Sequence, residues 1–196
     1  ASDLSTCFRY SYGVGTGAMG VPNDDSRWGN CYGNIRATNH MFERAVSSYT
    51  GNLADIKKEL AEGHFFRAYN YFYLLKFFGG VPVVTKVLDV TSPELYGKRN
   101  SRYEVVNLIL SDLDEAIAGL PLEQNITSAD KGKISKQAAQ AFKARVLLYE
   151  ATWRKYNGTS TDFEGSAGPA SDQVNTFLEE SVQLSEIVMG DAAYSL

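Results

Sequence analysis

The sequence contains few of the residues that most often carry chemistry at neutral pH. Its 196 residues include two histidines, His40 and His64, and two cysteines, Cys7 and Cys31. The histidines form no H-E-x-x-H zinc motif, and the chain has neither a G-x-S-x-G nucleophile motif nor a calcium-binding loop. The sequence therefore predicts a protein that is not an enzyme and that needs no cofactor or metal ion.

The two cysteines leave two possibilities open. Cys7 and Cys31 pair as a disulfide in an oxidising compartment if their Cα atoms come close enough, or they remain separate thiols. Their positions in the sequence alone do not choose between these outcomes.

The chain also lacks an excess of positive charge and a long apolar run. The net charge is −4, so nucleic acid is not an expected partner. Arg67 and Lys76 interrupt the most apolar stretch, which is too short to span a bilayer. No signal peptide or lipid-attachment motif is visible, but the chain begins abruptly at Ala1, so this absence excludes neither. A hydrophobic content of 44% and a charged content of 21% are typical of a folded globular domain.

What the chain has in abundance is aromatic residues, and they concentrate in one stretch. Eight of the fifteen residues from His64 to Phe78 are Phe or Tyr. No β-branched residue occurs there before Val81, which favours a helix, and apolar side chains all round it predict neighbours on several sides. The Gly79-Gly80 pair is expected to end the helix, and Pro82 to send the chain onward in an extended conformation.

Residues 1–31 are predicted to be irregular because glycine, proline and polar residues dominate them. Gly15 to Gly20 spells G-x-G-x-x-G, the dinucleotide-binding fingerprint. That motif requires a strand before it and a helix after it, whereas Pro22 and an Asn-Asp-Asp turn follow here. A loop is the better interpretation.

Periodic apolar residues predict helices in the rest of the chain. The first helix, over residues 32–49, should bury one face; a second begins near Leu53 and continues through the aromatic stretch. A third follows the capping-box sequence Ser101 to Glu104 and ends before Pro121, a fourth follows Ser135, and a fifth covers about residues 172–189. The residues expected on the buried faces of the first, third, fourth and fifth helices are Tyr32, Ile35, Asn39, Phe42, Val46 and Tyr49; Tyr103, Val106, Leu110, Leu113, Ile117 and Leu120; Ala138, Phe142, Val146, Tyr149 and Trp153; and Val174, Phe177, Leu178, Leu184 and Val188.

The same patterns predict the surroundings of several polar residues. Asn39 lies within an apolar stripe, so its amide should bond a neighbouring backbone or side chain, and we expect Arg67 to be bonded there too. His64 is interpreted as a packed residue rather than a ligand. Asp112, Asp114 and Glu115 are assigned to a solvated helix face rather than to an acid–base pair.

Together these elements predict an all-α fold of tetratricopeptide-like helical hairpins with long irregular loops. The repeat lengths are irregular, which argues against a uniform array. We expect residues 1–196 to form one helical domain that belongs to a longer chain, since no final capping element is evident.

Aromatic residues near the N-terminus indicate a binding site. Tyr10, Tyr12, Trp28 and Tyr32 lie in or beside a region rich in Asn, Asp and Arg. Flat rings beside hydrogen-bonding side chains suit a sugar, whose C–H faces stack and whose hydroxyls need polar partners. The alternative is that Trp28 and Tyr32 start the first helix and pack beneath it; for Trp28 the two interpretations are equally supported.

Several segments resemble the SusD/RagB family. The segment AEGHFFRAYNYFYLLKFFGGVPVVT is similar to the family pattern A-E-x-x-F-x-R-A-x-x-Y-F-x-L-x-x-x-F-G-G-V-P-L, and WGNCYGNIRATNHMFERAV is similar to the family's first helix. Further similar segments are SRYEVVNLILSDLDEAIAGLP, GKISKQAAQAFKARVLLYEA and the terminal GDAAYSL. The resemblance covers residues 24–196, in order and at compatible spacings.

The resemblance implies a glycan- or nutrient-binding lipoprotein on the surface of the outer membrane of Bacteroidetes. Such a protein delivers oligosaccharide to a TonB-dependent SusC-like transporter, and its lipid anchor is absent from this chain. Carried over by motif, the ligand-facing residues would be Ser2-Asp3 and Trp28, with Arg9 nearby. With Tyr10 and Tyr12, the predicted glycan-binding residues are therefore Asp3, Arg9, Tyr10, Tyr12 and Trp28. A helical-repeat scaffold that holds a protein partner without a ligand of its own is the alternative function.

Overall fold

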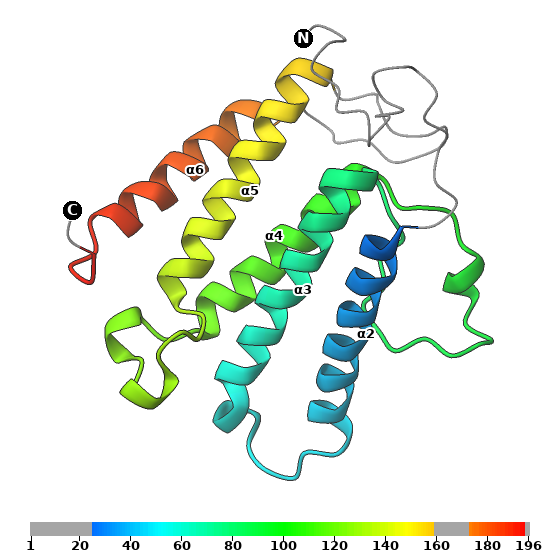
Figure 1. The fold of residues 1–196 in the computed structure, drawn as a ribbon, viewed down its shortest axis with the longest axis horizontal. Coiled ribbons are helices and arrows are strands. Elements are labelled where there is room, and N and C mark those ends of the chain that lie inside the picture. The colour runs from blue at the N-terminus through cyan, green and yellow to red at the C-terminus, as the bar shows by residue number, and fades with distance from the viewer. Residues whose placement is uncertain (1–24, 159–172, 195–196) are drawn as a thin grey trace, which may run out of the picture.

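The computed structural model describes residues 25–158 and 173–194, and all regular secondary structure in this part of the chain is helical, without strands. Consecutive helices run antiparallel and pack on one another, so that they form a stack of hairpins (Figure 1). The α-helices are α2 (Ser26–Ser47), α3 (Lys57–Phe78), α4 (Arg102–Gly119), α5 (Lys136–Asn157) and α6 (Val174–Met189), and the short 3-10 helices are η2 (Leu53–Ile56), η3 (Pro93–Tyr96), η4 (Glu123–Asn125) and η5 (Ser128–Asp130). The predicted fold class is confirmed.

Local capping chemistry sets several helix boundaries where the sequence predicted them. The Ser101 hydroxyl accepts from the Glu104 N–H at 3.2 Å, and the Glu104 carboxylate accepts from the Ser101 N–H at 2.7 Å. This reciprocal pair satisfies two backbone donors that the first turn of α4 leaves open. The Ser135 hydroxyl caps α5 by accepting from the Ala138 N–H at 3.2 Å. Gly79 ends α3 with φ of 68°, a left-handed conformation that favours glycine.

The start of α2 differs from the prediction. The helix begins at Ser26 rather than near Tyr32, so the prediction that residues 26–31 are irregular was wrong. Asp25 is the N-cap, and its carboxylate accepts from the Arg27 N–H at 2.9 Å. Gly29 made this start hard to predict from the sequence, because glycine is unfavourable inside a helix. The cap and the neighbouring turns nevertheless support the helix here.

The other end of α2 also departs from the predicted face. Ile35 and Asn39 are buried as expected, but Val46 is 79% exposed and Tyr49 is 40% exposed. Ala45 is buried in their place. Apolar residues at intervals of three and four therefore continue in the sequence beyond the part of α2 that α3 covers.

Helix α3 is the central buried helix that its aromatic sequence predicted. It packs against α2 and α4 (Figure 1), and Tyr71, Leu74 and Leu75 are fully buried. Its burial is not complete around the circumference, because Phe66 and Phe77 are each about half exposed. Helix α3 therefore has core neighbours on some sides and an exposed aromatic row on another.

Helix α5 lies between α4 and α6, and this changes which of its residues are buried. Ala138, predicted to face the core, is exposed, whereas the adjacent Ala139 is buried. Val146 is buried as predicted, and Phe142 is half-buried. A helix with neighbours on two sides buries a wider stripe than one apolar face, so polar residues of α5 enter the interior as well.

Two ionic clusters lie inside this stack, and the sequence indicated only part of the first. In the cluster that we call the Asp112 cluster, the Asp112 carboxylate accepts from Arg67 Nε at 2.8 Å and Nη2 at 2.7 Å. It also lies 2.7 Å from His64 Nδ1, and Arg67 Nη1 donates to Asn39 Oδ1 at 2.9 Å. The expected bond between Asn39 and Arg67 is confirmed. The assignment of Asp112 to a solvated face was wrong, because α3 covers that side of α4 and leaves Asp112 only 2% exposed.

The second cluster, which we call the Glu150 cluster, joins α4, α5 and the start of α6. Glu150 Oε2 accepts from Arg102 Nε at 2.9 Å and Nη2 at 2.8 Å, and Oε1 accepts from Arg154 Nε at 2.8 Å. Arg154 Nη1 donates to Gln173 Oε1 at 3.0 Å, directly before α6. Each cluster therefore ties three consecutive parts of the stack together.

Candidate functional site

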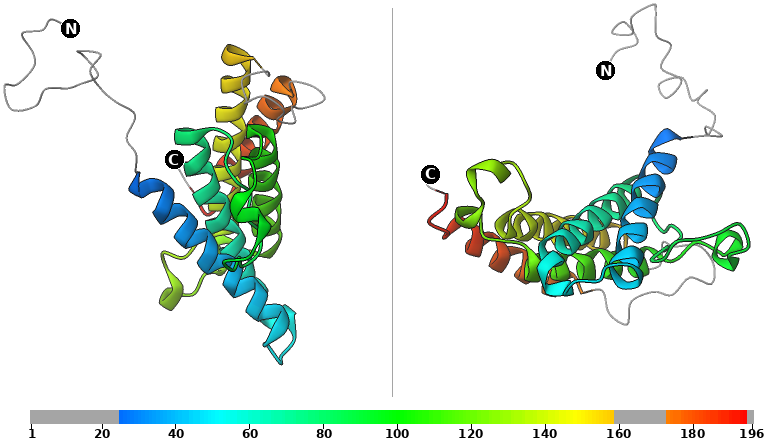
Figure 2. Two further views of the ribbon diagram at one scale, coloured as in Figure 1. Left: turned by 90° about the vertical axis from the view of Figure 1, so that its right-hand side faces the viewer. Right: turned by 90° about the horizontal axis from the view of Figure 1, so that it is seen from below.

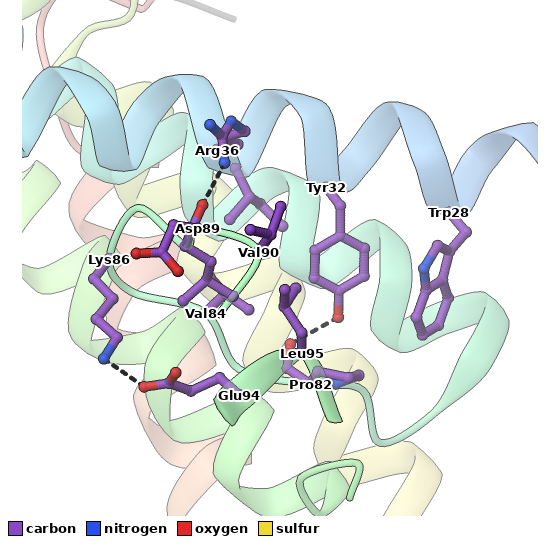
Figure 3. Close-up of a pocket in the computed structure, with 12 residues that line it drawn as sticks. Trp28, Tyr32, Arg36, Pro82, Val84, Lys86, Asp89, Val90, Glu94 and Leu95 are labelled. Atoms are coloured by element: carbon purple, nitrogen blue, oxygen red, sulfur yellow. Dashed lines mark hydrogen bonds and ion pairs between the residues drawn. The ribbon is translucent and has the colours of Figure 1, made fainter. Parts of the chain in front are cut away.

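The segment between α3 and α4 projects from the helical stack (Figures 1 and 2). Together with α2 it lines an open groove. The groove has a volume of about 660 Å³. One wall is the side of α2 that faces residues 82–95, and the other consists of residues 82–95 themselves, including the start of η3 (Figure 3). The residues that line it are Trp28, Tyr32, Ile35, Arg36, Pro82, Val84, Lys86, Leu88, Asp89, Val90, Glu94 and Leu95.

Two aromatic residues of α2 form one end of the groove. The ring centroids of Trp28 and Tyr32 lie 5.0 Å apart. Those of Trp28 and Phe78 lie 5.2 Å apart, in a T-shaped arrangement. The Tyr32 hydroxyl donates to the Pro82 carbonyl at 2.7 Å, and burial raises the pKa of this phenol. Tyr32 therefore stays protonated and holds the two walls together. Trp28 is half-buried, so it both packs beneath the helix and lines the groove.

Charged side chains line the other end. Arg36 Nη1 donates to the Leu88 carbonyl at 2.8 Å, and its guanidinium remains exposed. Lys86 pairs with Glu94, and this hydrogen bond to the ammonium lowers the pKa of the Glu94 carboxyl. The Thr91 hydroxyl and N–H donate to Asp89, which lowers the pKa of that carboxyl. Both carboxyl groups, of Asp89 and Glu94, are therefore ionised at neutral pH.

The wall at residues 82–86 is held by side chains of the helices, since the described part of the chain contains no strand. The Val84 N–H donates to the Tyr71 hydroxyl at 2.7 Å, and the Val84 carbonyl accepts from Tyr71 at 3.1 Å and from Asn39 Nδ2 at 2.9 Å. Asn39 Nδ2 also lies 3.3 Å from the Lys86 carbonyl, and Asn100 Oδ1 accepts from the Val83 N–H at 2.8 Å. These contacts satisfy backbone groups that an extended segment without a partner strand leaves open.

The structure places one of the predicted ligand residues, Trp28, in the groove. The others, Asp3, Arg9, Tyr10 and Tyr12, lie outside the described residues, as do Cys7 and the Gly15–Gly20 motif. Cys31 is buried in the core. In the part of the chain that the structure describes, no three His, Cys, Asp or Glu residues are placed to hold a metal ion, and no helix is long and apolar enough to cross a bilayer.

Sequence reasoning missed the charged residues of the groove. Arg36 carried a signal that was available, because Trp28, Tyr32 and Arg36 follow one another at intervals of four and so share a face of α2. Lys86, Asp89 and Glu94 carried none, since they come from an aperiodic segment that only the fold brings opposite α2.

The groove combines apolar and aromatic surface with a few fixed polar groups. Rings and aliphatic side chains can pack against the C–H faces of a sugar, while charged side chains bond its hydroxyls. The fold and this groove define a helical-hairpin protein with an open, amphipathic groove.

Comparison with known proteins places the chain in a family. The sequence model of the SusD-like family described as starch-binding associating with outer membrane matches residues 21–148. The chain belongs to this SusD-like family, as its sequence motifs predicted.

Individual relatives agree with this assignment. A SusD-like protein of Formosa agariphila is 34% identical over 108 residues, which are 55% of this chain and 20% of that protein. The crystal structure of a SusD-like protein from Bacteroides fragilis matches with a TM-score of 0.60 and 31% identity, over 83% of this chain and 27% of that one. A laminarin-binding SusD-like protein matches with a TM-score of 0.57 and 26% identity, over 72% of this chain and 32% of that one. The chain thus spans a third or less of the length of these relatives.

Proposed function

We propose that the groove between α2 and residues 82–95 binds an oligosaccharide and that the protein is a nutrient-binding lipoprotein of the outer membrane. The observation that carries this proposal is the placement of Trp28 and Tyr32 beside exposed Arg36 in one groove. Membership of a family described as starch-binding supports a carbohydrate as the ligand, and that family's association with the outer membrane supports the location.

Each part of the proposed site has a separate role. Trp28 supplies an apolar surface on which a sugar ring packs, and Arg36 supplies N–H donors for hydroxyl groups. Asp89 supplies acceptor oxygens, because its carboxylate is ionised. Asp3, Arg9, Tyr10 and Tyr12 precede α2 in the sequence, and we retain them as proposed ligand contacts.

The proposal also covers the partner, which is a transporter, and states that the protein does not chemically alter the oligosaccharide. The bound oligosaccharide passes unchanged to a TonB-dependent SusC-like transporter, and a lipid anchor attaches the protein to the cell surface. Support comes from the chain's resemblance to the SusD/RagB segments and from the family's description as binding proteins.

Titration calorimetry on the longest natural polypeptide that contains this chain tests the proposal. The panel includes malto-, laminari- and xylogluco-oligosaccharides. Trp28→Ala should weaken binding at least about tenfold, since a central aromatic contact dominates sites of this kind. Tyr156→Ala is the control, because Tyr156 is 76% exposed on α5 and does not line the groove.

The outcomes separate two functions. Loss of binding in Trp28→Ala alone supports the glycan-binding proposal, whereas equal binding by the two variants contradicts the placement of the site. If the unaltered protein binds no member of the panel but still captures the transporter in a pull-down, the helical-scaffold function is favoured instead.

A further inference from the structure

The polar groups of Val84 are satisfied by two residues that do not themselves line the groove. Tyr71 is fully buried in α3, and Asn39 is 1% exposed in α2. The Tyr71 hydroxyl accepts from the Val84 N–H at 2.7 Å and donates to the Val84 carbonyl at 3.1 Å, while Asn39 donates to the same carbonyl at 2.9 Å. Three hydrogen bonds from the core therefore converge on one residue of the groove wall.

The orientation of the Asn39 amide is fixed from its other side. Asn39 Oδ1 accepts from Arg67 Nη1 at 2.9 Å, so the opposite end of the amide, Nδ2, must face Val84. Arg67 is in turn held by two hydrogen bonds to Asp112. A continuous series of contacts leads from the ionic cluster of α3 and α4, through Asn39, to the wall of the groove.

We infer that Tyr71 and Asn39 are positioning residues, which hold the wall at the distance from α2 that a ligand requires. This inference rests on the proposed function, because it concerns the affinity of that same groove. An extended segment without a partner strand opens locally at low free energy unless other groups bind its backbone. Tyr71 and Asn39 supply those groups, so ligand affinity depends on residues that the ligand does not touch.

Two parts of the wall differ in a way that supports this role: residues 83–86, which we call the root, and residues 87–95, which we call the tip. Val84 and Lys86 bond buried side chains, those of Asn39 and Tyr71, whereas among the described residues the α-helices make one hydrogen bond to residues 87–95, from exposed Arg36 to the Leu88 carbonyl. Val90 at the tip is 83% exposed. The root therefore sets the width of the groove.

Tyr71→Phe is the sharpest test, because it removes one oxygen atom and keeps the ring that packs in the core. Hydrogen exchange at residues 82–88 should accelerate, and affinity for the oligosaccharide that binds best in the panel should fall about tenfold. Ser181→Ala is the matched control: it removes a buried hydrogen bond, to the Ala144 carbonyl at 2.8 Å, far from the groove. This control should lower the melting temperature without changing exchange at residues 82–88 or affinity.

A second variant separates the two bonds of Asn39. Asn39→Asp keeps an oxygen for Arg67 but cannot donate to Val84, so it should accelerate exchange at the wall as Tyr71→Phe does. If both variants match Ser181→Ala in exchange and affinity, the inference is overturned even though Trp28→Ala loses binding. If the unaltered protein binds no oligosaccharide, the proposed function fails, and the exchange measurement still decides whether Tyr71 and Asn39 position the wall.

Discussion

The Asp112 cluster and the Glu150 cluster both bury a carboxylate between helices, but they connect to different parts of the molecule. Each places one carboxylate at the centre of a helical interface and satisfies it with buried cationic or imidazole donors. The Asp112 cluster continues through Asn39 to the wall of the groove. The Glu150 cluster continues to Gln173, directly before α6. One cluster therefore supports the candidate site, and the other joins α4, α5 and the start of α6.

The surroundings of the two clusters reinforce this difference. Arg154 lies 4.8 Å from the ring centroids of both Tyr103 and Phe177, and Arg102 lies 3.9 Å from that of Trp153. In the Asp112 cluster, Arg67 lies over one ring, Phe42, and His64 remains partly accessible. Similar ionic chemistry can thus serve a closed interface or connect a core to a surface site, and the neighbours decide which.

The largest effect on stability is expected from Glu150→Gln. This change removes the buried carboxylate that Arg102 and Arg154 share, and breaking a buried pair costs about 3–5 kcal/mol of unfolding free energy. Denaturant unfolding measures the loss. Hydrogen exchange at residues 82–88 should stay as in the unaltered protein in native buffer, and selective acceleration there would show that the two clusters are not separate.

Arg67→Leu should lower the unfolding free energy by about 3 kcal/mol, because it removes the guanidinium and leaves the buried Asp112 carboxylate with the His64 ring as its remaining side-chain partner in the cluster. Unlike Glu150→Gln, it should also accelerate exchange at residues 82–88, since Asn39 loses the bond that orients it. Thermal melting and exchange on the same samples check both effects. An unchanged melting temperature would contradict the role assigned to this buried bond.

Acid should weaken the Asp112 cluster within a defined range of pH. Burial acts to raise the pKa of Asp112, but hydrogen bonds from Arg67 and His64 outweigh it and hold the pKa below the ordinary value of 3.8. A lowered folded-state pKa stabilises the fold above the unfolded-state pKa, and this contribution disappears as pH falls through the folded-state value. The difference in melting temperature between the unaltered protein and Asp112→Asn should therefore shrink below pH 3.8. A difference that stays constant from pH 6 to pH 2.5 would contradict this.

The smallest effect is expected at the exposed ion pair of the groove. Lys86 and Glu94 keep 63% and 36% of their side-chain surface accessible, so solvent screens the attraction between them. Glu94→Gln should leave the melting temperature within experimental error. A clear decrease would mean that the loop pair stabilises the fold as the buried clusters do.

Much of the fold followed from local sequence patterns. The Ser101–Glu104 capping box, the Gly79 stop and the aromatic helix all appear where they were predicted, because each depends on residues within a few positions of one another. The family also followed from contiguous motifs. Predictions were wrong at Asp112, Val46 and Ala138, where burial depends on which neighbouring helix covers the residue.

The candidate site was predictable only where it lies on one helix. Trp28 was selected from the sequence, and Arg36 could have been added by its spacing on α2. The opposite wall, residues 82–95, has no periodic pattern that predicts its position. Its placement depends on Tyr32, Asn39 and Tyr71, which bond residues far from them in the sequence.

The sequence by itself determined the helices, their caps and the family of this protein. The tertiary structure alone decided that Asp112 is buried beside Arg67, 45 residues earlier in the chain, and that residues 82–95 face α2 as a groove. The physical reason is the range of the interactions. Caps and helical periods act within one or two turns, whereas a buried ion pair and a groove wall exist only after distant segments have packed together.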